Sequence, residues 1–329
     1  MKNKIYIFAL LLLLVLSSCK IKRTSDGIIY ERAGTEGLAI DFLPNSPPAR
    51  IVVGKADREI NVVVEARNKG AYPELDRKKP QKLEGKLFIG GFAKNIIDFK
   101  DNDKIDLNSL FLEGRSNANP SGGFDLAEFK GIIKSQELPF DKFSPVFSAI
   151  ACYKYQTVAT TPVCIDAEPY SDLRINKVCK IHPITLATQG APIAVIKLDE
   201  EVLSDSIQFR IAIKNVGNGD VLDAEPIKCD PNANTEEARI QRKNFDLVKL
   251  KSVQLEKKEL KCRPLVKGTS GNEEYIRLIN GEGFLLCSAD ITSNMRAQAY
   301  GYTTPLEITL DYAYRNTIQK QVEIVKLKE

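Results

Sequence analysis

The sequence predicts an all-β protein made of two tandem antiparallel β-sandwich domains. Three observations lead to this prediction. Hydrophobic and polar residues alternate with a period of two in several long segments, Gly, Pro and Asn separate those segments, and helical periodicity is scarce. Because many short strands joined by such turns are typical of sandwiches, this architecture is favoured over other β folds.

The clearest alternation occurs twice. Residues 60–70 read INVVVEARNKG and residues 207–217 read IQFRIAIKNVG, so both segments end in Asn-x-Gly. A period of two predicts a strand with one buried face, and Asn and Gly supply the following turn because both tolerate positive φ. In the second segment the residues predicted to be buried are Ile207, Phe209, Ile211 and Ile213.

A second pair of segments also matches. Residues 146–157 (VFSAIACYKYQT) and 306–317 (LEITLDYAYRNT) both follow a proline, both alternate, and both contain Tyr-x-Tyr. Proline at the start of a segment is compatible with an edge strand or a first strand position. The tyrosines are Tyr153 and Tyr155 in the first segment and Tyr312 and Tyr314 in the second.

These matches predict that one domain type is used twice. The first pair of segments is offset by 147 residues and the tyrosines of the second pair by 159, so the second copy contains an insertion, expected at residues 230–243 with one helical turn. The predicted organisation is a signal peptide (1–18), a tether (19–33) and two sandwiches (34–167 and 168–329). Further strands are expected at 37–42, 82–92, 124–133, 191–198, 248–262 and 283–291.

Both copies resemble a known domain family. On the strand ending Asn68-Lys69-Gly70 and its counterpart ending Asn215-Val216-Gly217, the chain resembles the immunoglobulin-like CARDB-type domains of bacterial and archaeal surface proteins. The resemblance implies immunoglobulin-like sandwiches that act as adhesion or spacer modules. The chain departs from the immunoglobulin tyrosine corner, which places Tyr two residues before Cys, because Cys152 precedes Tyr153 and Tyr312 has no neighbouring Cys.

The N-terminus has the pattern of an export signal. A basic start is followed by an uncharged stretch at residues 5–16, which is shorter than the about 20 residues needed to span a bilayer. Residues 16–19 (LSSC) resemble the bacterial lipobox, which implies cleavage before Cys19 and a diacylglycerol on its sulfur. The alternative is an ordinary cleavage site with an incidental cysteine. The basic residues that follow, Lys20, Lys22 and Arg23, fit a solvated tether better than a headgroup contact.

Charge and cysteine content narrow the class of protein. The net charge is +4, and two of the lysines lie within the signal, so the balance gives no case for nucleic-acid binding. Apart from Cys19, an even number of cysteines in an exported chain predicts disulfides, with fifteen possible connectivities. The expected pairs are Cys262 with Cys287, Cys164 with Cys179 and, by remainder, Cys152 with Cys229. No CxxC spacing supports a zinc or redox site.

Candidate catalytic and metal-binding residues are few. His182 is the single histidine and would have to serve any Ser-His-Asp or Cys-His mechanism, but its place near the domain boundary favours a connecting role. Asp101 and Asp103 are weak calcium candidates, because Ile105 stands where an EF-hand needs an oxygen ligand. The polar stretch 115–123 is expected to be a loop that is open to binding. No catalytic residue and no cofactor is predicted.

The function predicted from these features is that of a non-enzymatic, extracytoplasmic lipoprotein, anchored to the cell membrane, that binds a partner, adheres or acts as a spacer. The partner is an unidentified protein or glycan. Two alternatives remain open: an envelope-glycan hydrolase or its accessory subunit, which would need a pair of carboxylates across a cleft, and a solute-binding lipoprotein. The second class usually has helices between its strands, which this sequence lacks.

Overall fold

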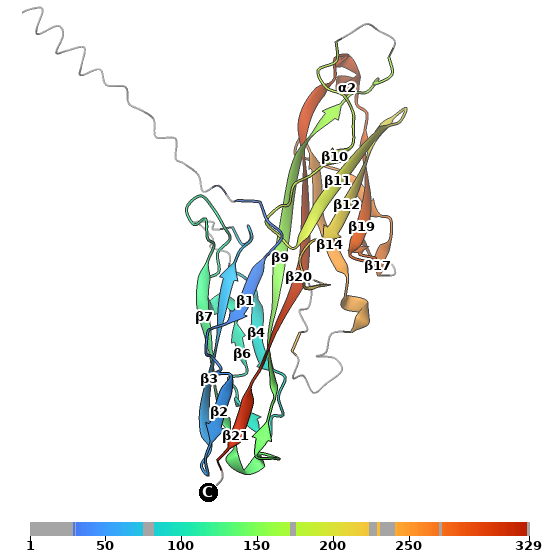
Figure 1. The fold of residues 1–329 in the computed structure, drawn as a ribbon. Coiled ribbons are helices and arrows are strands. Elements are labelled where there is room, and N and C mark those ends of the chain that lie inside the picture. The colour runs from blue at the N-terminus through green and yellow to red at the C-terminus, as the bar shows by residue number, and fades with distance from the viewer. Residues whose placement is uncertain are drawn as a thin grey trace, which may run out of the picture.

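Two strands of 20 residues, β9 (Val146–Ile165) and β20 (Tyr302–Gln321), pair antiparallel along their whole length. The computed structural model describes residues 29, 31–74, 82–171, 176–223, 229–230, 241–269 and 272–327. In Figure 1 the green β9 and the red β20 extend through both lobes of an elongated molecule. Both are the predicted Tyr-x-Tyr segments, but β9 continues eight residues past the expected end at residue 157 because Ala159, Val163 and Ile165 remain buried on the same face.

The prolines that were expected to begin these strands behave differently. Pro145 directly precedes β9, whereas Pro305 lies inside β20, opposite Pro162 of β9. Proline is tolerated there because the neighbouring strands β4 (Gly85–Gly90) and β14 (Leu247–Leu255) do not pair with either position.

Lobe 1 is a sandwich around the first half of β9. One sheet has the order β1 (Leu38–Phe42), β3 (Arg58–Asn68), β7 (Phe124–Ile133) and β5 (Ile97–Asp98). The facing sheet contains β4, β6 (Lys104–Asp106), β9 and the second half of β20. Val64, Phe129, Leu87 and Phe147 from the two sheets belong to one buried core. A small sheet of β2 (Arg50–Val53), β21 (Glu323–Lys326) and β8 (Lys142–Phe143) closes the end near the C-terminus.

Lobe 2 has the corresponding arrangement around the first half of β20. One sheet has the order β10 (Ile184–Thr185), β11 (Ile193–Val202), β12 (Ser206–Asn215), β19 (Glu282–Asp290) and β16 (Lys261–Pro264). The facing strands are β20, β14, β13 (Asp220–Leu222), β15 (Lys258–Glu259), β18 (Asn272–Arg277) and β17 (Lys267–Thr269), with the second half of β9. Within the described residues, the helical elements are η1 (Leu107–Ser109), η2 (Ser135–Glu137), η4 (Arg242–Asn244) and α2 (Ser293–Ala297).

The fold class predicted from the sequence is confirmed: the described chain is all-β, with its sheets packed face to face. β7 has the predicted bounds, and β1, β3, β12 and β19 differ from prediction by at most two residues at either end. The expected single strand at 248–262 is wrong, since a turn with positive φ at Glu256 and Lys257 divides it into β14, β15 and β16. The expected helical turn at 230–243 lies largely outside the described residues.

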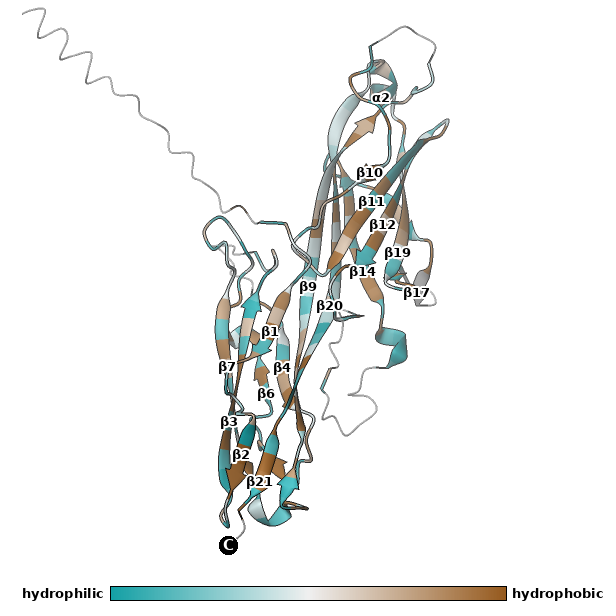
Figure 2. Cartoon of the chain, viewed as in Figure 1, coloured by the Kyte–Doolittle hydropathy of each residue, from teal (hydrophilic) through white to brown (hydrophobic). Residues whose placement is uncertain are grey.

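The predicted alternation of faces holds along β12. Ile207, Phe209, Ile211 and Ile213 are fully buried, whereas Arg210 on the other face is exposed. Ala212, which was expected on the exposed face, is buried because Phe284 lies directly opposite it in β19. Figure 2 shows hydrophobic and hydrophilic residues alternating along these strands. The alternation therefore identifies the core-facing side, with a small residue as its exception.

Three disulfides tie the lobes. Cys152–Cys229, Cys164–Cys179 and Cys262–Cys287 are 77, 15 and 25 residues apart, and these are the pairs expected from the sequence. Cys262 and Cys287 face each other across β16 and β19. Cys152 lies on β9 near the middle of the molecule, so its disulfide fastens a loop of lobe 2 to a strand that begins in lobe 1. The described part of the chain includes no helix with the length and apolarity to cross a bilayer.

Candidate functional site

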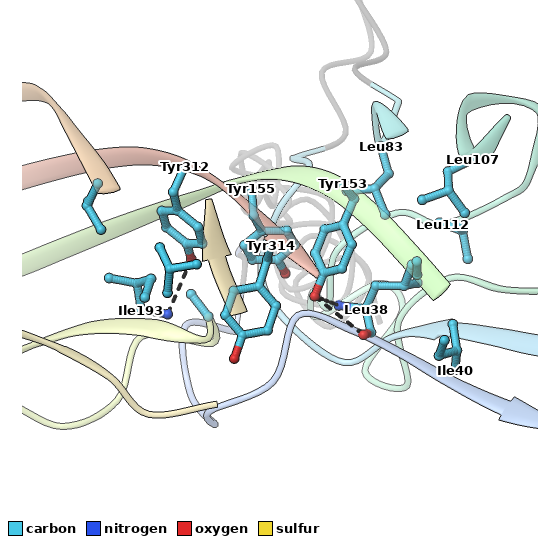
Figure 3. Close-up of a cluster of buried hydrophobic side chains, with 14 of the residues drawn as sticks. Leu38, Ile40, Leu83, Leu107, Leu112, Tyr153, Tyr155, Ile193, Tyr312 and Tyr314 are labelled. Carbon is cyan, nitrogen blue, oxygen red and sulfur yellow. Dashed lines mark hydrogen bonds between the residues drawn. The ribbon is translucent and has the colours of Figure 1, made fainter. Parts of the chain in front are cut away.

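Four buried tyrosines lie where the two lobes meet. The register of β9 and β20 places Tyr153 opposite Tyr314 and Tyr155 opposite Tyr312. Because residues two apart share a face, all four rings point into the same layer, with adjacent ring centroids 5.7–6.5 Å apart. Figure 3 shows the four rings side by side, with Ile193 of β11 at one end of the row and Leu38 of β1 at the other. The Tyr-x-Tyr motifs thus form one cluster, which we name the tyrosine junction.

The first tyrosine of each motif holds the first strand of its own half. The hydroxyl of Tyr153 accepts a hydrogen bond from the Leu38 amide in β1 (3.1 Å), and that of Tyr312 accepts one from the Ile193 amide in β11 (3.4 Å). Leu38 and Ile193 are the first residues of their strands. The two contacts are therefore the same contact made twice.

Two polar side chains add bonds that cross between the halves. Asn316 of β20 donates to the Leu38 carbonyl, and Thr157 of β9 donates to the Ile193 carbonyl (2.6 Å). The Thr157 hydroxyl also lies 2.9 Å from the Tyr312 hydroxyl. Each long strand thus binds a strand from the other half of the sequence, within the lobe that its own second half enters.

The second tyrosine of each motif binds the Asn-x-Gly turn. The hydroxyls of Tyr155 and Tyr314 donate to the side-chain oxygens of Asn68 and Asn215, and both bonds measure 3.1 Å. The amide nitrogen of each asparagine donates to the carbonyl four residues further along the chain, at 2.6 Å and 3.0 Å. Sequence reasoning assigned these asparagines to turn geometry alone and missed their bonds to the tyrosines.

The glycines of the two turns have a steric role. A Cβ at Gly70 would overlap with the Tyr155 hydroxyl, and one at Gly217 would overlap with the Tyr314 hydroxyl. Only a residue without a side chain lets each turn approach the ring this closely. The shared Asn-x-Gly motif is therefore required by the tyrosine junction as well as by the turn.

Burial raises the pKa of all four junction tyrosines. Their hydroxyls stay protonated at physiological pH, so they can donate as well as accept hydrogen bonds. Each makes hydrogen bonds within the protein. This arrangement suits a structural lock.

A small pocket of ≈ 160 Å³ opens beside Tyr314, lined among others by Glu36, Pro192 and Gly219. The corresponding place in the other half is filled, because Tyr72 packs edge-on against Tyr155 with ring centroids 5.4 Å apart. Gly219 occupies the position of Tyr72 in the second half and leaves the space open. The pocket has room for a small ligand.

A partly buried acid lies near the outer end of lobe 2. One carboxylate oxygen of Glu200 in β11 is buried without a hydrogen-bond partner. Burial raises the pKa of Glu200 to about 7, the Cys164 amide counters this, and the charge of Asp166 adds to the rise. Asp166 itself is paired with Lys177 at 2.9 Å. This site could not be recognised from the sequence, because Glu200 belongs to the acidic run Asp-Glu-Glu, which suggests a solvated strand end.

The residues singled out for chemistry do not assemble into an active site in the described chain. His182 is exposed, and its Nδ1 lies 2.9 Å from the Lys180 carbonyl. Asp103 pairs with Lys94 at 3.2 Å, Asp101 is exposed, and the described residues contain no group of three or more His, Cys, Asp or Glu that could hold a metal ion. Cys19, the predicted lipidation site, lies outside the described residues.

The polar stretch 115–123 is the loop expected from the sequence, and it is pinned at both ends. The Arg115 amide donates to the Gly70 carbonyl (2.7 Å), and the Gly123 amide donates to the Glu113 carbonyl (2.8 Å). Its Asn117 side chain binds the backbone of residue 29, so this loop holds the start of the described chain. No protein-family model matches the chain, and no curated protein matches it in sequence.

Proposed function

We propose that this protein is an extracytoplasmic lipoprotein that serves, without catalysis, as a rigid two-lobed platform for binding a partner at the membrane surface. The observation that carries the proposal is the ladder of β9 and β20, which joins the lobes through 20 paired residues on each strand and is locked by the tyrosine junction. The three disulfides support an oxidising compartment outside the cytoplasm, because such bonds persist there.

The platform is proposed to be a tandem repeat of CARDB-like, immunoglobulin-type modules. Three sets of contacts support this. Leu38 pairs with Asn68 as Ile193 pairs with Asn215, and the tyrosine hydroxyls make matching bonds to the two asparagines. In addition, the second half of each long strand lies in the other lobe. Tyr155→Phe and its counterpart Tyr314→Phe should then cost similar stability, about 1 kcal/mol each. A large inequality in urea unfolding would argue against equivalence.

The tether joins the platform at its middle. The Gly34 amide donates to Thr188, and the Gly190 amide donates to the Gly34 carbonyl, so residues 31–37 lie at the meeting point of the lobes. A lipid on Cys19 would therefore hold the molecule near its middle, where the lobes meet, and leave the outer ends of both lobes accessible. This geometry favours a binding platform over a spacer attached at one end.

The anchor is tested by Cys19→Ser. The variant should move from the membrane to the soluble extracytoplasmic fraction, because two acyl chains supply the stable attachment. Ser18→Ala, which keeps a small residue before the cysteine, is the matched control and should remain with the membrane. Retention of Cys19→Ser after a high-salt wash would contradict the lipid anchor.

The non-enzymatic platform is tested with the purified, lipidated protein. Crosslinking in native membranes followed by purification should recover a defined protein or glycan partner, and the yield should fall for Cys19→Ser. Release of soluble fragments from purified envelope glycans by the protein alone would contradict the proposal and favour a hydrolase.

A further inference from the structure

Large apolar side chains are exposed where the tether joins the fold. Ile29 is 70% exposed, Phe111 60%, Phe124 39% and Leu126 42%. Neighbouring exposed residues of this size are unusual on a soluble surface and indicate a contact with another apolar surface. We name these four residues the tether-side patch.

Hydrogen bonds link the segments that carry the four residues. Ile29 and Asn117 are joined by two hydrogen bonds, of 3.0 Å and 2.8 Å, at the tip of the loop that begins with Phe111. At the base of the loop the Phe111 amide donates to the Asp125 carboxylate (3.1 Å). Phe124 and Leu126 are two residues apart in β7 and therefore share its outer face, whereas Asp125 points to the other face. The patch therefore wraps around the edge of β7 that the described strands leave free at this end.

The tether enters lobe 1 at the tether-side patch, because Ile29 belongs to the patch. Cys19 and Ile29 are ten residues apart in the sequence, so a fully extended tether spans at most about 33–36 Å. Phe140 is 73% exposed but follows the far end of β7, which at its ten residues separates it from Phe124 by about 33 Å. The tether-side patch is therefore the exposed apolar surface of lobe 1 that adjoins the tether.

We propose that the tether-side patch docks onto the lipid bilayer that holds the acylated Cys19. The inference rests on the lipid anchor of the proposed function and adds the face that the protein turns to the membrane. Phenylalanine and aliphatic side chains at such a surface enter the boundary between headgroups and acyl chains, where their apolar area leaves water. The tether supplies proximity and the patch supplies orientation.

The charges around the patch indicate whether apolar contact or electrostatic attraction would hold it on the membrane. The basic residues nearest to it are engaged within the protein: Arg115 with Glu31 (2.6 Å), Arg32 with Glu74 (2.8 Å), Lys69 with Glu36 (3.3 Å), and Arg67 over the ring of Phe124 (4.5 Å). Paired charges give little attraction to anionic lipid. Docking should therefore depend on apolar contact and persist at high salt.

The chain has no tryptophan, so a single introduced Trp reports its own environment. The lipidated variant Phe111→Trp, reconstituted in phosphatidylcholine vesicles with brominated acyl chains, should show blue-shifted emission and at least twofold stronger quenching than lipidated Phe140→Trp. Phe140 is the matched control because it is also an exposed phenylalanine in a loop of lobe 1. The quenching should be unchanged in 1 M salt.

Flotation of the same vesicles separates the two proposals. If the protein floats with the vesicles but Phe111→Trp is quenched no more than Phe140→Trp, the docking face is wrong and the anchor stands. If the protein does not float, both the anchor and the docking built on it are overturned. Leu126→Trp provides a second probe should Phe111→Trp fail to fold, and it must give the same result.

Discussion

Replacing Ile211 by Asp should unfold both lobes, although the residue lies in lobe 2. Ile211 is fully buried in β12. Losing its apolar side chain costs about 2–5 kcal/mol, and burying an unpaired carboxylate adds several kcal/mol more. The sum exceeds about 5 kcal/mol, which is comparable to the whole stability of an ordinary domain. Because the ends of β9 and β20 belong to both lobes, lobe 1 should lose its order together with lobe 2.

The matched control is Arg210→Asp, one residue away on the exposed face. Alternation alone predicts a nearly neutral change, but the structure predicts a measurable one. Arg210 stacks on Phe284 at 5.0 Å, a contact that contributes about 0.5–1 kcal/mol. The new Asp would also face Asp199 directly across the strand pair, and like charges in that position cost up to about 1 kcal/mol. The expected loss is therefore about 1–2 kcal/mol.

Urea unfolding gives the two losses, and hydrogen exchange of peptides from β7 and β12 reports each lobe separately. In Ile211→Asp, amides of β7 should lose protection together with those of β12. Protected β7 amides beside an unprotected β12 would refute the coupling through the long strands. Equal losses for the Ile211 and Arg210 variants would mean that the buried face of β12 has been misidentified.

Three further changes test the junction, the disulfides and the buried acid. Thr157→Val removes the hydrogen bonds to Ile193 and Tyr312 and should lower the free energy of unfolding in urea by about 1–3 kcal/mol. Thr160→Val, on the exposed side of the same strand, should change it by no more than about 0.5 kcal/mol. Equal effects would show that the bonds of Thr157 do not stabilise the tyrosine junction. Replacing Cys152 and Cys229 together by Ala opens a loop of 77 residues and should cost about 4.5 kcal/mol in the chain-entropy model, more than opening the disulfide with the 15-residue loop; the reverse order in unfolding experiments would contradict this. The pKa of Glu200 is raised from 4.5 to about 7, so the folded state holds this proton more tightly and stability should decrease as pH rises through that window. Glu200→Gln should flatten that part of the stability profile, and an unchanged slope would show that the acid does not titrate there.

Much of the local structure could be predicted from the sequence, because alternation depends only on neighbouring residues. The strands and their buried faces, including the long buried face of β12, follow from the alternation of apolar and polar residues. The disulfide between Cys262 and Cys287 was expected across two neighbouring strands, and both residues lie on the strands that pair there. These features are local or involve elements that neighbour each other in one sheet.

The remaining features depend on contacts between distant segments. Nothing in the local pattern shows that β9 pairs with β20 along its whole length, since each segment alone is consistent with an ordinary last strand of a sandwich. Asn316 and Thr157 are isolated polar residues whose partners lie 278 and 36 residues away. Glu200 is half-buried, and one of its carboxylate oxygens is covered by residues from distant segments such as Asp166. Tertiary packing, which single-sequence patterns do not encode, decides all three.

The pairing of β9 with β20 and the position of the tether together determine how the two lobes are oriented relative to the tether. Lys154 faces Ala313 at the centre of the tyrosine junction, and the same hydrogen bonds recur on either side of this pair. Rotation of one lobe against the other would strain bonds from both halves at once, so the lobes should keep one relative orientation. In the lipid-anchored arrangement that we propose, a single apolar contact beside the tether would orient lobe 1 on the membrane and, through the shared strands, lobe 2 as well. A partner that binds at either end would meet a surface at a defined height and angle above the bilayer.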